Sequence, residues 1–327
     1  MIHTEQLTRH FVSKKETVEA VKGVDIDVAP GELVAFLGPN GAGKSTTLRM
    51  LTTLLPPTSG RAWVAGASVV DEPSTVRSRI GYIGQGSGGG HSFRVRDELV
   101  MQGKFYGMNS TDAAARATEL MQTLDLSALG KRAVSTLSGG QRRRLDVALG
   151  LMHRPALLFL DEPSTGMDPQ NRANLWEHIG RLRERQQTTI VLTTHYLEEA
   201  DTQAERVLVI DHGQIIADDT AANLKATLAG DRIAVTVDPA DADAGAAIMA
   251  DRGRELTRSE DALGEVLVGR FEQGTRTLPG LLASMHGSGI EVRAADVRVP
   301  TLDDVFLSLT GRSLREEAGS EIERAAA

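Results

Sequence analysis

A glycine-rich segment between an apolar run and a helical pattern contains the residue types that bind phosphate. It fits the spacing G-x-x-x-x-G-K-[ST] and, with the threonine after it, consists of Gly38, Pro39, Asn40, Gly41, Ala42, Gly43, Lys44, Ser45 and Thr46. Glycines let the backbone N–H groups approach phosphate oxygens, and the start of the following helix adds partial positive charge. Lys44 would reach the β- and γ-phosphates, and the Ser45 hydroxyl would bind Mg²⁺. The alternative, a glycine turn that binds nothing, is disfavoured by the strand pattern before it and the helix pattern after it.

A second apolar run, residues 157–160, ends in two acids, Asp161 and Glu162. In open α/β sheets, ligands bind at the carboxyl ends of the strands. Asp161 would hold the magnesium directly or through water, and Glu162 is placed to polarise an attacking water molecule. An ordinary solvated acid pair is the alternative, and the phosphate loop on the same chain argues against it.

The chain contains a second helix start of the kind that binds anions. It consists of Leu137, Ser138, Gly139, Gly140 and Gln141. Serine is also a favoured helix N-cap, and residue chemistry alone favours that simpler explanation. The next three residues, Arg142, Arg143 and Arg144, are interpreted as one solvated face of the helix.

These motifs lie on a pattern of alternating strands and helices, which predicts a parallel α/β core over the first 220 residues. Buried strands are expected at residues 33–37, 157–160 and 189–192, and helices at 45–55, 141–153, 169–186 and 196–204. From about residue 231 the order becomes strand, helix, strand, strand, helix, strand, which is typical of a ferredoxin-like split sheet. A helix at 302–310 follows. We therefore predict a first domain at 1–225, an α+β accessory domain at 226–312 and a flexible tail at 313–327.

Composition excludes several classes of protein. The chain has 327 residues, a net charge of −8 and no cysteine, so disulfides, thiolate metal sites and cysteine nucleophiles are ruled out. It has no basic tail or basic domain, and we expect no nucleic-acid partner. No run of 18 apolar residues occurs, and the N-terminus lacks a basic start followed by an apolar segment. We therefore expect neither a membrane-spanning segment nor a secretory signal.

The chain resembles ATP-binding cassette (ABC) proteins, because residues 137–141 read LSGGQ, the signature of that family, and the other family motifs occur in the family's order. The phosphate loop matches Walker A, and Asp161 with Glu162 matches Walker B and the glutamate after it. The remaining matches are Gln85 at the Q-loop position, residues 164–168 with Asp168 as the D-loop, His195 as the switch histidine, and Phe11 where the family places an aromatic residue that stacks on adenine.

The resemblance implies a P-loop NTPase cassette with a parallel-sheet core, an antiparallel β subdomain and a helical subdomain, followed by a small α+β domain. It implies ATP and Mg²⁺ as cofactors, with Glu162, His195 and Lys44 as catalytic groups. Metal ligands would be Ser45, Gln85 and Asp161, and the nucleotide would also contact Phe11, the phosphate loop, Asp168 and Ser138 to Gln141. In the family two cassettes pack head to tail, so that each ATP lies between one Walker A and the signature of the other subunit. A homodimer is therefore expected.

Residues 141–146 and 301–311 resemble the daunorubicin/doxorubicin-resistance type of ABC ATPase. In that type the ATPase is a peripheral subunit on the cytoplasmic face of the cell membrane, and it powers drug export through a separate integral membrane permease. A plain docking helix is the alternative explanation of residues 301–311, because one helix face is shared by Leu302, Val305, Phe306 and Leu309. Phe93, Phe105 and Tyr106 could line a groove for a permease helix or belong to the core.

Two other functions remain open at this stage. One is a soluble ABC ATPase that acts on a nucleoprotein, and the other is a module whose ATP site regulates a partner. Nucleoprotein ATPases of the family usually carry two cassettes in one chain, long insertions or zinc modules, and this sequence has one set of motifs and no cysteine.

Overall fold

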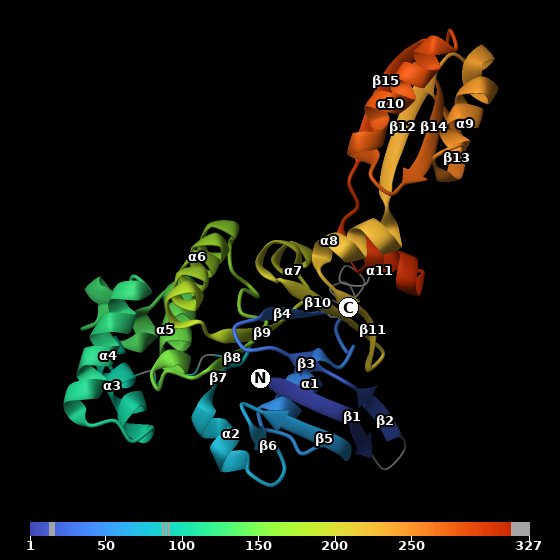
Figure 1. Cartoon of the computed structure of the whole chain (residues 1–327). Coiled ribbons are helices and arrows are strands. Elements are labelled where there is room, and N and C mark those ends of the chain that lie inside the picture. Colours follow the sequence, from blue (N-terminus) through green and yellow to red (C-terminus); the bar gives the residue numbers. More distant parts are fainter. Residues whose placement is uncertain (13–16, 87, 89, 91, 315–327) are drawn as a thin grey trace, which may run out of the picture. The chain divides into compact units, whose positions relative to one another are not determined.

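The computed structural model describes residues 1–12, 17–86, 88, 90 and 92–314. The chain forms two units, Met1–Asp218 and Asp219–Ala327 (Figure 1). The first unit thus ends before residue 225, where the sequence predicted the boundary. The reason is that α8 (Ala221–Leu224) and the short π-helix η3 (Lys225–Ala229) pack against α11 (Leu302–Thr310) in the second unit.

A six-stranded sheet in the first unit carries the motifs. Its strand order is β11-β10-β4-β9-β8-β7, and β10, β4, β9, β8 and β7 are mutually parallel. The strands are β4 (Leu33–Leu37), β7 (Ile80–Ile83), β8 (Leu157–Asp161), β9 (Thr189–Thr194), β10 (Arg206–Asp211) and β11 (Gln214–Asp219). Every residue of β4, β8 and β9 is buried, as the apolar runs predicted. Because these strands are parallel and neighbouring, the segments that follow their carboxyl ends all begin at one edge of the sheet.

An antiparallel sheet covers the helix that follows the phosphate loop. It consists of β1 (Ile2–Val12), β2 (Thr17–Val24), β3 (Asp27–Val28), β5 (Ser59–Val64) and β6 (Ala67–Ser68). Helix α1 (Lys44–Leu51) lies between this sheet and the parallel one, since Leu48 and Leu51 belong to the same apolar cluster as Val64 of β5 and Phe36 of β4. Helix α2 (Pro73–Arg79) leads from β6 into β7.

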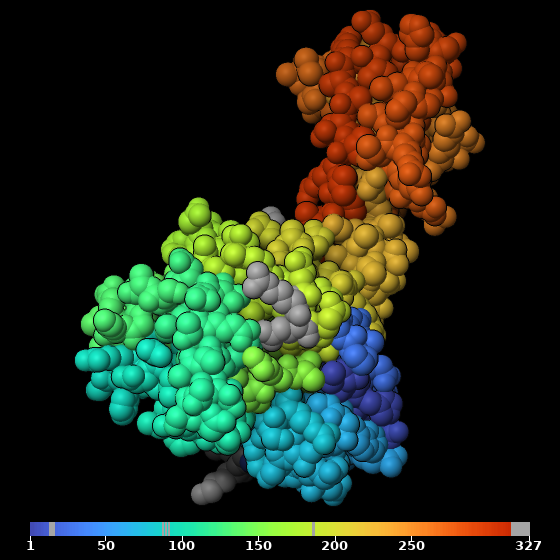
Figure 2. All heavy atoms as spheres, turned by 60° about the vertical axis from the view of Figure 1, so that its left-hand side comes forward, coloured from blue at the N-terminus to red at the C-terminus, as the bar shows by residue number. Residues whose placement is uncertain are grey.

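A helical layer follows β7 and carries the LSGGQ segment (Figure 2, teal to green). It contains α3 (Val95–Phe105), α4 (Ser110–Thr123), the short helices η1 (Ser127–Leu129) and η2 (Val134–Thr136), and α5 (Gly139–Leu151). Arg116 of α4 is buried, donates to Leu151 O at 2.8 Å and pairs with Glu119 at 2.8 Å. This contact ties α4 to the end of α5. Helices α6 (Pro169–Gln186) and α7 (Leu197–Gln203) then alternate with β9 and β10.

The second unit has the split topology predicted from its element order. Its antiparallel strand order is β13-β14-β12-β15. Its elements are β12 (Asp231–Val237), η4 (Pro239–Asp241), α9 (Ala242–Ala250), β13 (Arg254–Asp261), β14 (Gly264–Phe271), α10 (Gly274–Gly287) and β15 (Val292–Arg298). One face of the sheet buries Ile233, Val235 and Leu267 against Met249 and Met285 of the two helices. The order β-α-β-β-α-β is therefore confirmed.

Helix α11 ends the described part of this unit. Thr301 and Asp304 form a reciprocal capping box at its N-terminus. Beyond it, the Ser313 hydroxyl donates to Asp303 Oδ2 at 2.9 Å and Leu314 N donates to Asp303 Oδ1 at 2.9 Å. Ser313 and Leu314 are thus fastened to α11, and the rest of the predicted tail lies outside the described residues. Within the described part of the chain, no helix combines the length and apolarity needed to cross a membrane.

We expect Phe306→Ala to destabilise the second unit, because the ring of Phe306 is fully buried in α11. Removing a buried phenyl group costs about 3–5 kcal/mol. Leu307→Ala is the matched control, since Leu307 is adjacent and 42% exposed. Hydrogen exchange should accelerate in α8, η3 and α11 for Phe306→Ala only, and equal effects of the two variants would contradict this packing.

Candidate functional site

The phosphate loop wraps so closely against neighbouring backbone that two of its glycines have no room for a side chain. A Cβ atom on Gly38 would lie 2.1 Å from Ile210 O, and one on Gly43 would lie 2.5 Å from Ala20 O. Gly43 also has φ of 104° and is the N-cap of α1. The loop therefore runs directly from β4 into a helix N-terminus, where backbone N–H groups favour an anion.

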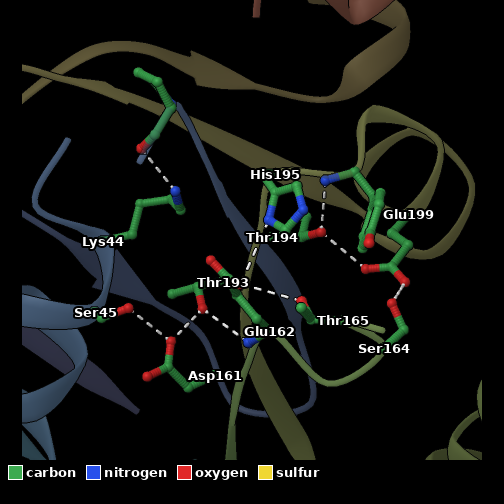
Figure 3. Close-up of polar contacts among 12 residues, drawn as sticks. Lys44, Ser45, Asp161, Glu162, Ser164, Thr165, Thr193, Thr194, His195 and Glu199 are labelled. Atoms are coloured by element: carbon green, nitrogen blue, oxygen red, sulfur yellow. Dashed lines mark hydrogen bonds and ion pairs between the residues drawn. The ribbon is translucent and has the colours of Figure 1, made fainter. Parts of the chain in front are cut away.

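Lys44 lies under this loop with its side chain 4% exposed. Its Nζ donates to Gly38 O at 2.7 Å and to Pro39 O at 2.8 Å, and Figure 3 shows one of these two contacts. These carbonyls hold the ammonium group beside the N-terminus of α1. A phosphate bound by the loop would thus meet a fixed positive charge as well as N–H donors.

Three hydroxyl groups surround the carboxylate of Asp161 where β8 ends beside α1. Asp161 is 1% exposed, and its Oδ1 accepts hydrogen bonds from Ser45 Oγ at 2.9 Å and from Thr193 Oγ1 at 2.7 Å. Tyr82 OH lies 3.4 Å from Asp161 Oδ2. The predicted pair Ser45 and Asp161 is therefore in direct contact (Figure 3). Thr193, which sequence reasoning missed, fixes the carboxylate from β9.

Glu162 stands at the turn that leaves β8. Its φ of 48° lies in the left-handed region, which a non-glycine residue adopts only when its surroundings enforce it. Here Thr193 enforces it, because Glu162 N donates to both Thr193 O and Thr193 Oγ1 at 3.1 Å. The turn aims the Glu162 side chain out of the strand and toward His195.

The Glu162 carboxylate contacts two other side chains. Thr165 Oγ1 donates to Glu162 Oε2 at 3.1 Å, and His195 Nδ1 lies 3.4 Å from the same oxygen. The interaction with the His195 ring outweighs burial and lowers the pKa of Glu162 below its usual value. The geometry thus keeps Glu162 ionised and beside His195, as a group that orients water must be.

A buried glutamate that the sequence did not single out connects two of these segments. Glu199 is 3% exposed and accepts hydrogen bonds from Ser164 and from Thr194 Oγ1 at 2.8 Å (Figure 3). It also accepts one from Trp176 Nε1 at 3.1 Å. It joins residues 164–168 to the strand end that carries His195. In the sequence, Glu198 and Glu199 look like an exposed acidic pair, and only the tertiary contacts separate them.

The LSGGQ segment forms a helix start of the simple kind that residue chemistry favoured. Ser138 is the N-cap of α5, and its Oγ accepts from Gln141 N at 3.3 Å while Gln141 Oε1 accepts from Ser138 N at 3.1 Å. A hydroxyl that accepts here can still donate its proton to an anion. A Cβ on Gly139 would meet nothing within 4 Å, so this end of the helix is open to a ligand.

A pocket of about 480 Å³ lies between this helix start and the segments after β7 and β8. Its lining residues among those predicted are Gln85, Ser138, Gly139, Gly140, Glu162 and Asp168. Asp168 is the N-cap of α6, and hydrogen bonds from Asn171 lower the pKa of its carboxyl. The lining of this pocket does not include Lys44 or Ser45. The signature thus borders the chain's own Gln85 and Glu162 at a pocket that the phosphate loop does not line.

The interpretation of Arg142–Arg144 as one solvated face is wrong, most clearly for Arg143, and the Arg144 side chain is also only 12% exposed. Arg143 is 8% exposed, and its guanidinium donates to main-chain carbonyls outside α5. A usable signal was present, because Arg143 precedes Val147 by four residues and Leu151 by eight. That spacing places it on the same buried face of the helix.

Phe11 belongs to the antiparallel sheet, near the end of β1. Its ring is 40% exposed, and the Arg9 guanidinium carbon lies 4.8 Å from its centre. It is therefore an aromatic surface that a flat ligand can reach. Of the remaining predicted residues, Ala42 is buried within the phosphate loop, and Thr46 lies on α1.

Comparison with known proteins decides the family. The sequence model described as "ABC transporter" matches residues 21–165. The chain is 42% identical over 303 residues to a daunorubicin resistance ATP-binding protein of Streptomyces coeruleorubidus, covering 92% of this chain and 94% of that protein. This chain belongs to the ABC transporter family. The predicted resemblance to the daunorubicin/doxorubicin-resistance type is confirmed.

Other relatives extend the match over almost the whole cassette and its second unit. The chain is 41% identical to the daunorubicin/doxorubicin resistance ATP-binding protein of Streptomyces peucetius, with 96% of each protein covered. It is 33% identical to the linearmycin resistance ATP-binding protein of Bacillus subtilis, covering 97% of this chain and all of that protein. The chain is an ATP-binding subunit and an ATPase of this family.

Solved structures give the fold. A dimeric ATP-binding cassette in a post-hydrolysis state with ADP and Pi matches with a TM-score of 0.62 and 24% identity, covering 67% of this chain and 98% of that one. The predicted cassette fold, with a parallel core, an antiparallel sheet and a helical layer, is confirmed by this likeness and by the sheet order.

We expect Thr193→Val to slow ATP hydrolysis by about 10–100-fold, because Asp161 is a predicted metal ligand and removing a group that orients such a ligand usually has this effect. The methyl group cannot donate to Asp161 or accept from Glu162 N. Steady-state hydrolysis measures the effect, and Thr193→Ser, which keeps the hydroxyl, is the control. A Val variant as fast as wild type would show that this hydroxyl does not position the site.

Proposed function

We propose that two copies of this chain bind two ATP molecules between them and power the efflux of drugs or other amphipathic compounds. The compounds would pass through a separate integral membrane permease, with the ATPase bound to its cytoplasmic face. The observation that carries the proposal is the convergence of Lys44, Asp161 and Glu162 at one edge of the sheet, after β4 and β8, which lie on either side of β9. The relatives support export, since their names specify resistance to daunorubicin, doxorubicin and linearmycin or export of Nod factor.

In this proposal each ATP is held by groups from both subunits. Phe11 stacks on the adenine, and the loop with its backbone N–H groups, Lys44 and Thr46 holds the phosphates. Ser138 of the partner subunit, with the glycines and Gln141 after it, faces the γ-phosphate from the other side, near Asp168. A homodimer is supported by the single copy of each motif and by the pocket that joins the signature to its own Glu162 rather than to Lys44.

The donor set fits Mg²⁺ as the metal. Ser45 Oγ and Asp161 Oδ1 are hard oxygen donors 2.9 Å apart, and the family resemblance implies the Gln85 amide as a third oxygen ligand. Among the described residues there is no group of three or more His, Cys, Asp or Glu that could hold a metal alone. This suits Mg²⁺, which usually binds one or two carboxylates together with substrate phosphates and water. When bound, it neutralises charge on the phosphates.

Hydrolysis then follows from the positions of Glu162 and His195. The ionised Glu162 orients a water molecule in line with the γ-phosphorus, and a new O–P bond forms as the bond to the β–γ bridging oxygen breaks. ADP leaves with that oxygen, and the proton released by the water passes to Glu162 or to the phosphate. His195, Lys44 and Ser138 of the partner subunit stabilise the charge that develops.

The exposed aromatic residues of the helical layer support docking on a permease. Phe93 is 58% exposed and Phe105 is 80% exposed, so neither belongs to the core. Tyr106 is partly covered because it stacks on His153, with ring centres 3.7 Å apart. These rings offer an apolar surface for a partner helix.

Transport tests the proposal directly. Inside-out vesicles containing this chain and a candidate permease, a neighbouring gene product with about six apolar membrane spans, should accumulate amphipathic fluorescent dyes when ATP is added. Vesicles with Lys44→Ala should not, because the loop has lost its cation. ATP hydrolysis that neither depends on the permease nor moves any dye of the panel would favour the regulatory or nucleoprotein function instead.

We expect Glu162→Gln to keep ATP affinity while turnover falls by at least about a thousandfold, because the amide cannot orient or accept a proton from water. Nucleotide binding and hydrolysis are measured on the same preparation. Lys44→Ala is the contrasting variant and should lose binding or hydrolysis. Turnover by Glu162→Gln at the wild-type rate would remove Glu162 from the catalytic role.

A further inference from the structure

The guanidinium of Arg143 is surrounded by main-chain carbonyls of two other segments. Nη1 donates to Gly84 O at 2.6 Å and Nε donates to Pro163 O at 2.6 Å. Nη2 donates more weakly to Asp161 O at 3.3 Å and to Glu162 O at 3.4 Å. A buried cation is costly unless its donors are satisfied in good geometry. Because Arg143 meets this condition through fixed backbone oxygens, it holds those segments at set positions relative to α5.

Asp146 makes a second contact of this kind one turn further along the same helix face. It is 7% exposed, and its Oδ1 accepts from Gly88 N at 2.9 Å. Gly84 and Gly88 lie on either side of Gln85 in the sequence. Helix α5 is therefore hydrogen-bonded to the backbone on both sides of Gln85. Arg143 binds the residue before Gln85, and Asp146 binds a residue after it.

The same helix begins at the LSGGQ segment. Ser138 caps α5 five residues before Arg143, and an α-helix is rigid over so short a distance. The carbonyls of Glu162 and Pro163 lie where the chain leaves β8 for residues 164–168. Two side chains of α5 thus join the signature, the Gln85 segment and the backbone of Glu162.

We propose that Arg143 and Asp146 are positioning residues that hold the Ser138 end of α5 in a fixed position relative to the Gln85 segment and to the backbone after Asp161. This inference rests on the proposed function, in which Gln85 faces the chain's own ATP and Ser138 faces the ATP of the partner subunit. The clamp formed by Arg143 and Asp146 would then keep the signature where it can complete the site of the partner subunit while Gln85 stays at the chain's own site. ATP binding to one subunit alone does not need the clamp, whereas closure of the dimer and hydrolysis do.

The test compares variants of Asp146, because Arg143→Met strips four carbonyls of their donor and can unfold the chain. In the full-length protein, Asp146→Ala should lower kcat by at least about tenfold, as expected when reacting groups are misplaced. In the Glu162→Gln background, the same change should leave the Kd for ATP within about twofold and abolish ATP-driven dimerisation. Asp146→Asn keeps an oxygen that can accept from Gly88 N and should restore kcat to within about threefold of wild type.

Arg144→Ala is the matched control on the same helix. Arg144 contacts Asp125 at 3.4 Å and Asn174 at 3.1 Å, away from the Gln85 segment. Its kcat and dimerisation should stay near those of wild type. The proposal is overturned if Asp146→Ala keeps wild-type kcat and dimerisation, if Asn is as impaired as Ala, or if ATP affinity and melting temperature fall together with kcat. Turnover by Glu162→Gln itself would instead reject the proposed function, since that variant leaves the clamp intact.

Discussion

A nucleoside triphosphate concentrates several negative charges within a few ångströms, and the groups that neutralise them must surround it. The structure places one set of such groups at the end of β4, where Lys44 and the start of α1 face the same space. A second helix start, at Ser138, borders a pocket that Lys44 does not line. This separation is the constraint on which our proposal depends, because in the proposed dimer each copy of the chain contributes halves of two different sites.

The parallel sheet determines how the predicted catalytic and metal-binding groups meet. Asp161 and Glu162 end β8 and His195 follows β9, so their order in space comes from strand pairing rather than from sequence distance. Thr193 then sets both acids at once, by donating to one carboxylate and accepting from the backbone N–H of the other. Glu199 connects the same strand end to Ser164. The hydrogen bonds that Thr193 and Glu199 make therefore determine the geometry of the site, together with the two acids themselves.

The sequence predicted the parts of the molecule that depend on local patterns. The buried strands, the phosphate loop and the split topology of the second unit follow from apolar runs, glycine spacing and element order. It did not predict the contacts that depend on packing between distant segments. Arg143 looked solvated because arginine is rarely buried, and its carbonyl partners lie about 20 and 60 residues away, as Pro163 and Gly84 show. Likewise the first unit ends at Asp218 instead of at the predicted residue 225. The reason is that α8 packs on α11, and no local sequence pattern encodes this contact.

Complementation between two inactive variants tests the shared site most directly. One variant is Lys44→Ala, which keeps its signature, and the other is Ser138→Arg, which keeps its phosphate loop. Each alone should be inactive. Mixed in equal amounts, they should recover roughly a quarter of wild-type ATP hydrolysis, because half of the dimers would contain one intact site of two. A mixture that stays as inactive as its components, or a Ser138→Arg chain that hydrolyses ATP at the wild-type rate by itself, would contradict the account.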